Sequence, residues 1–167
     1  GSGRHDEKVE RTLQHLADRQ QAIGQDGGDM RPLMHAGVEL AQRNSGHHIQ
    51  PDQGFALIQA LIRQASDPDK NPLPADQLRM VVAGLVAVWN PQTSAEVVLK
   101  LMQSAENQPG GVRHEQLKAV AEGFGIGMGW KGMSLINHHV EQHYKGNIPE
   151  GAQQLFKQIG AGQATGK

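Results

Sequence analysis

The sequence predicts an all-α fold made of stacked antiparallel helix pairs, and three observations lead to this prediction. Apolar residues recur every three or four positions along most of the 167-residue chain, which is the period of one helix face. Prolines and glycines divide the chain into short segments. Similar pairs of segments return about every 40 residues, which is typical of a helical repeat array.

The composition allows an aliphatic core and excludes several kinds of site. Apolar residues make up 37% of the chain, and the aromatic residues are three Phe, two Trp and one Tyr. No cysteine is present, which excludes disulfides, thiolate metal sites and cysteine nucleophiles. The net charge is −1 with both signs interspersed, so neither nucleic acid nor a membrane surface is an expected partner.

No targeting signal is visible in the sequence. The first residues lack the apolar segment of a signal peptide, and Gly1-Ser2-Gly3 is typical of a tag remnant. We therefore expect a cytoplasmic protein, or one secreted without a signal peptide. Residues 1–5 and the tail at 161–167 are expected to be irregular, with a single helical domain over residues 6–160.

The first expected helices are separated by clear breaks. One helix covers residues 6–23, and a second begins near Met30 and stops within 43–48. Pro51 opens the third helix and Pro74 the fourth, because proline suits the first helical turn. The fourth helix ends at Asn90-Pro91. Thr93 and Glu96 then have the spacing of a capping box for the fifth helix.

The last helices follow a break at residues 108–111. A sixth helix begins near Arg113, a further helical segment covers 134–144, and Pro149 precedes a last helix at 150–160. The helices recur in pairs, because a shift of 39 residues places Leu78 on Leu117 and Gly84 on Gly123. The three units are 30–70, 73–111 and 112–148, flanked by the helices 6–23 and 150–160. Stacked pairs bury a stripe that one pair leaves exposed. The alternative is an ordinary helical bundle whose hairpins merely look alike.

The stretch EGFGIGMGWKG (122–132) contains the spacing G-x-G-x-x-G. A dinucleotide site needs a strand before these glycines, whereas the preceding residues have a helical period. Two other interpretations remain: a helix that packs closely through its glycines and unravels near Gly129 to Gly132, or an extended segment. The first is favoured, and it predicts that Gly125→Ala or Gly127→Ala destabilises the protein by steric clash.

A histidine-rich segment suggests a metal site. His139 and His143 lie one helical turn apart, a spacing that can bind a transition metal, with Glu141 between them. Val140 stands where a metalloprotease would have its glutamate, so that activity is not expected. A third ligand would have to come from elsewhere, such as His114 or Glu115. The alternative is a solvated polar face, and we expect no cofactor.

A two-helix unit of about 40 residues resembles the HEAT and armadillo repeats. The segment LVAVWNP (85–91), which closes a helix, resembles the Trp-Pro-ended SKWP-type repeats in type III effectors of plant-pathogenic bacteria. The following unit has Gly129-Trp130-Lys131 in place of Trp-Asn-Pro. The resemblance implies a non-catalytic binding module of a bacterial effector, acting in virulence.

The expected function is therefore an extended helical surface that holds a protein partner. A nearly neutral surface should bind through a few apolar anchors. We predict Trp130, Met133 and Trp89 as these anchors. Trp89 completes an apolar stripe, so a place in the core is its alternative. Trp130 ends a helix among glycines, which favours it as the main anchor.

Overall fold

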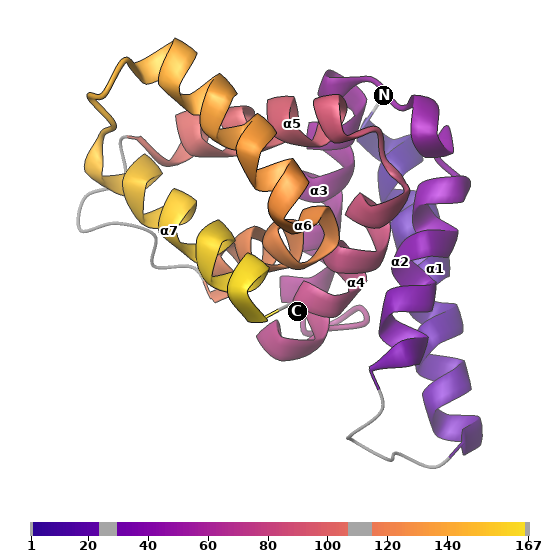
Figure 1. Cartoon of the computed structure of the whole chain (residues 1–167). Coiled ribbons are helices and arrows are strands. Elements are labelled where there is room, and N and C mark those ends of the chain that lie inside the picture. The colour runs from indigo at the N-terminus through magenta and orange to yellow at the C-terminus, as the bar shows by residue number, and fades with distance from the viewer. Residues whose placement is uncertain (1, 24–29, 107–114, 166–167) are drawn as a thin grey trace.

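The computed structural model describes residues 2–23, 30–106 and 115–165, and it confirms the all-α prediction (Figure 1). The described residues form seven α-helices and one 3-10 turn, and none of them forms a strand. The elements are α1 (Ser2–Ile23), α2 (Arg31–Gln42), η1 (Gly46–His48), α3 (Pro51–Ser66), α4 (Ala75–Val88), α5 (Pro91–Ala105), α6 (Glu115–Tyr144) and α7 (Glu150–Thr165).

Two helices extend beyond their expected limits, and tertiary contacts explain both extensions. α1 begins at Ser2, so residues 2–5 are helical rather than irregular, and His5 there hydrogen-bonds to the Asn44 side chain. α7 continues to Thr165, because Gly162 is buried against the backbone of Glu122 on α6. The breaks expected at 24–29 and 108–111, and the helix start near residue 113, lie outside the described residues.

The turn between α4 and α5 is capped differently from the prediction. The side chain of Asn90 accepts a hydrogen bond from the backbone N–H of Gln92 at 2.9 Å, and Pro91 starts the helix. Asn90 therefore takes the capping role that the spacing assigned to Thr93, three residues later. The Thr93 hydroxyl is buried and donates instead to the carbonyl of Ile49 at 3.1 Å.

α4 lies between α2 and the first half of α6, and these helices approach one another closely at glycines. A Cβ atom added to Gly37 of α2 would lie 2.7 Å from the backbone nitrogen of Leu85. One added to Gly84 of α4 would lie 3.0 Å from the Cα of Met34. α6 repeats this close approach to α4 at Gly123, and α7 packs against α6 in turn (Figure 1).

A second series of neighbours consists of α1, α3, α5 and the second half of α6. Polar contacts join each helix to the next: Arg63 to Asp6 at 3.1 Å, Lys100 to Asp52 at 2.8 Å, and His143 to Gln103 at 3.2 Å. Both series contribute to one apolar core, with Leu13, Leu40, Leu61, Leu85, Phe124 and Leu155 among its fully buried side chains. Among the described residues, no helix has the length and apolar character needed to cross a bilayer.

Candidate functional site

The glycine-rich segment 122–132 packs helices together, and nothing in its structure cradles phosphates. It is helical except at Gly129, which makes the extended-segment alternative wrong. A Cβ on Gly125 would lie 2.5 Å from the backbone nitrogen of Gln163, and one on Gly127 would lie 2.6 Å from the carbonyl oxygen of Ala83. The predicted close packing through these glycines is therefore confirmed. No strand of the described chain precedes them, so the dinucleotide-binding context is missing.

α6 is bent at a single residue, Gly129. Its φ of 68° and ψ of −171° are non-helical and belong to a region that essentially only glycine adopts. The expected unravelling over 129–132 is thus confined to one position, and helical structure resumes at Trp130. The side chain of Met128 crosses the bend and contacts Gly132, with its Cε 3.1 Å from where a Cβ would lie. The bend separates the half of α6 beside α4 from the half beside α5.

Trp130 is the first residue after the bend, and its side chain is 67% exposed. It is the one large apolar side chain that is exposed within the described part of the chain. The Lys131 Nζ lies 5.8 Å from the centroid of its ring, within the range of a cation–π contact. Met133 is half-buried against the core and lies on the same side of the helix, because residues three apart are neighbours there. These two predicted anchors therefore lie together.

Trp89 is a core residue in this structure, which corrects its assignment as an anchor. Its side chain is only 2% exposed and packs edge-on against Phe124, with ring centroids 6.1 Å apart. The helix backbone leaves room for the ring at Gly54, where an added Cβ would lie 3.2 Å from the indole. The chain leaves the helical conformation at Trp89, and the apolar stripe of α4 ends with this ring turned inward.

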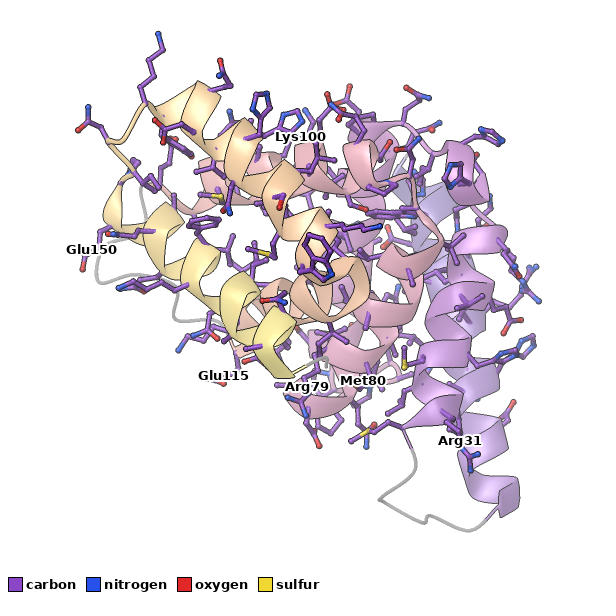
Figure 2. The ribbon with its side chains drawn as sticks, in the orientation of Figure 1. Arg31, Arg79, Met80, Lys100, Glu115 and Glu150 are labelled. Carbon is purple, nitrogen blue, oxygen red and sulfur yellow. The ribbon has the colours of Figure 1, made fainter. Side chains whose placement is uncertain are left out.

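The predicted metal ligands lie beside α5. The Nε2 of His139 is 3.0 Å from the amide nitrogen of Gln92, and the Nε2 of His143 is 3.2 Å from that of Gln103. Glu115 is at the far end of α6: in Figure 2 it lies at the bottom, whereas Lys100 of α5 lies at the top. His114 lies outside the described residues. No three metal-binding side chains converge in the described part of the chain.

A surface hollow of about 410 Å³ opens between the start of α3 and α5. It is lined by Gln50, Pro51, Asp52, Glu96, Leu99, Lys100 and Gln103. Its cation is already neutralised, because Lys100 pairs with the exposed Asp52. The hollow contains no nucleophile positioned against a base, so it does not define an active site.

Two side chains have clearly shifted pKa values, and neither belongs to a cleft. Burial and the neighbouring Lys8 charge lower the pKa of His5. Burial and a 2.9 Å hydrogen bond to Glu106 raise the pKa of Tyr144. The Tyr144–Glu106 bond ties the end of α6 to the end of α5, which is a structural role. The shifts therefore do not form an acid–base pair of the kind that marks catalysis.

Comparison with known proteins adds no relative, because no family model, curated protein or solved structure matches the chain.

Proposed function

We propose that this chain is a non-catalytic protein-interaction module built from repeated helix pairs, with Trp130 as its main anchor. The exposure of Trp130 carries the proposal. An aromatic side chain buries about 200 Å², so the 67% that is exposed corresponds to about 130 Å². Burying that area contributes about 3 kcal/mol at about 25 cal/mol per Å². Tryptophan is also enriched among the residues that dominate binding energy at interfaces.

A recurring contact supports the repeat architecture. Gly84 of α4 packs on the backbone of Met34, and Gly123 of α6 packs on the backbone of Arg79. Gly84 and Gly123 are equivalent under the 39-residue shift. Met34 and Arg79 are 45 residues apart, which matches the longer connection of the first unit. Leu33, Leu78 and Leu117 follow the same correspondence, and each is buried. The same crossing is thus used twice.

The second series follows the repeat as well. Leu57, Val97 and Ile136 succeed one another at shifts of 40 and 39 residues, and all three are fully buried. They belong to α3, α5 and the second half of α6, which contact one another in that order. In the third unit, the single residue Gly129 replaces the connection between the two helices of the pair. Because that turn has no buried tryptophan, it projects Trp130 outward.

The Trp-Asn-Pro segment supports the proposed relation to effector repeats. Each of its residues performs a separate task at one turn. Trp89 fills the core, Asn90 caps α5, and Pro91 starts that helix. A turn that combines these tasks suits a repeat unit that recurs. We therefore include in the proposal that the module belongs to a bacterial secreted effector and binds a host protein.

The proposal is tested by comparing the wild-type chain with Trp130→Ala. Proteins retained by the wild-type chain are identified, purified and titrated against both forms. We expect Trp130→Ala to weaken binding by about 100-fold, which corresponds to about 3 kcal/mol. Asn137→Ala, on the exposed side of α6, is the matched control and should change the affinity less than about twofold. Equal binding by Trp130→Ala and wild type would refute the assignment of the anchor.

The folding of the variant can be verified separately. An exposed side chain contributes little to stability, so Trp130→Ala should change the free energy of unfolding by no more than about 0.5 kcal/mol. A thermal melt followed by circular dichroism measures this. A lost interaction with an unchanged melt is then an effect on binding alone.

A further inference from the structure

We infer that His139 and His143 form a two-histidine site for a divalent transition metal ion, along the seam between α5 and α6. This inference is independent of the proposed interaction surface, because it concerns another face of α6 and another kind of ligand. It starts from the backbone. Ile136 and Val140 on the neighbouring face are 0% and 4% exposed, so this part of α6 is anchored in the core.

The helix therefore presents two imidazoles at a fixed spacing. Side chains four residues apart on a helix have Cβ atoms about 5–6 Å apart, which allows both to reach one ion. Pairs of histidines at this spacing are typical of helical zinc ligands. His138 is adjacent in sequence but points in another direction, with its ring edge-on to that of His139 and the centroids 5.9 Å apart.

The ring nitrogens are in the chemical state that a metal requires. The amide nitrogen of Gln92 can only donate a hydrogen bond, so the Nε2 of His139 accepts it and carries a lone pair. The same holds for His143 and Gln103. Both glutamines are exposed, so each can exchange its histidine partner for water at little net cost. A metal ion then takes the two lone pairs.

The surroundings favour a cation. Glu96 lies on α5 one turn after Gln92, and it forms no hydrogen bond or ion pair with any described residue. Gln92 and Gln103 are eleven positions apart, so the two rings lean toward opposite ends of the seam. Binding therefore requires a rotation of the imidazoles, with water completing the coordination. Imidazole ligands suit Cu²⁺, Ni²⁺ and Zn²⁺ and do not suit Mg²⁺ or Ca²⁺.

The test is a titration of the full chain with Ni²⁺, followed by isothermal calorimetry. We expect one ion per chain, and at least about tenfold weaker binding for His139→Ala and for His143→Ala. His138→Ala is the matched control and should stay within about twofold of the wild type. Mg²⁺ should give no binding. With Cu²⁺, electron paramagnetic resonance should detect two nitrogen ligands.

Three results would overturn the inference. They are the absence of Ni²⁺ binding, an unchanged affinity in both histidine variants, and an equal loss of affinity in His138→Ala. Thermal melts without metal distinguish unfolding from loss of ligands, because His139 and His143 lie outside the core. If either variant melts below the wild type, His143→Gln replaces alanine and keeps the polar contact to α5. Metal binding by that variant at wild-type affinity would also overturn the inference.

Discussion

Gly125 lies on the face of α6 that touches α7, and replacing it with alanine would place a methyl group against backbone. The added Cβ would lie 2.5 Å from the nitrogen of Gln163, 3.0 Å from the carbonyl carbon of Gly162, and against the carbonyl oxygen of Ile159. Backbone atoms of a helix cannot turn away as the end of a side chain can. The two helices must therefore separate locally.

The expected loss follows from two opposing terms. Overpacking of a core contact costs about 1–3 kcal/mol. Alanine is favoured over glycine within a helix by about 1 kcal/mol, which offsets part of that cost. The net destabilisation of Gly125→Ala is therefore about 1–2 kcal/mol. For a chain of this size, 1 kcal/mol corresponds to about 2–4 °C in melting temperature, so a decrease of about 2–8 °C is expected.

Gly160 provides the matched control, because it lies in α7 and an added Cβ there would meet nothing within 4 Å. Gly160→Ala should raise the melting temperature through helix propensity alone. Both variants are measured by circular dichroism against the wild type. If Gly125→Ala melts at or above the wild type, the close contact between α6 and α7 does not limit stability, and the packing argument is wrong.

Two further predictions concern the second half of α6. Gly129→Ala should destabilise the protein by about 1–2 kcal/mol in chemical denaturation, because φ is 68° there and a side chain is strained even though space is free; an unchanged midpoint would argue against the bend. Tyr144→Phe should cost about 1 kcal/mol at pH 7, since it removes the 2.9 Å hydrogen bond to Glu106. The raised pKa of Tyr144 adds a pH dependence, because stability is full below the ordinary tyrosine pKa and falls as the pH rises above it. The wild type should lose more stability than Tyr144→Phe between pH 8 and about 11, and parallel losses would contradict the bond.

Local rules predicted the helices well. The apolar period identified all seven helical regions, and prolines marked the starts of α3 and α5. These predictions succeed because an amphipathic period and a missing N–H act within a few residues. The glycine contacts of α6 were also predictable, since only close packing compensates for glycines inside a helix. Which helix each glycine meets could not be predicted, because that depends on residues far along the chain.

Local rules failed where a distant contact competed with them. The spacing of Thr93 and Glu96 suits a cap, but the carbonyl of Ile49 takes the Thr93 hydroxyl and Asn90 caps the helix instead. The two tryptophans follow similar apolar helices and end in opposite environments. Trp89 turns inward beside Gly54 and Phe124, whereas the bend at Gly129 turns Trp130 outward.

The amino-acid sequence alone determined the all-helical class, the helix positions and the small residues that let helices approach, because each depends on neighbours within one or two turns. Only the tertiary structure decided that α4 lies between α2 and α6, that Trp89 is buried, and that His139 and His143 face the glutamines of α5. Those outcomes depend on which surfaces exclude water together, and residues forty or more positions apart must meet before that choice exists.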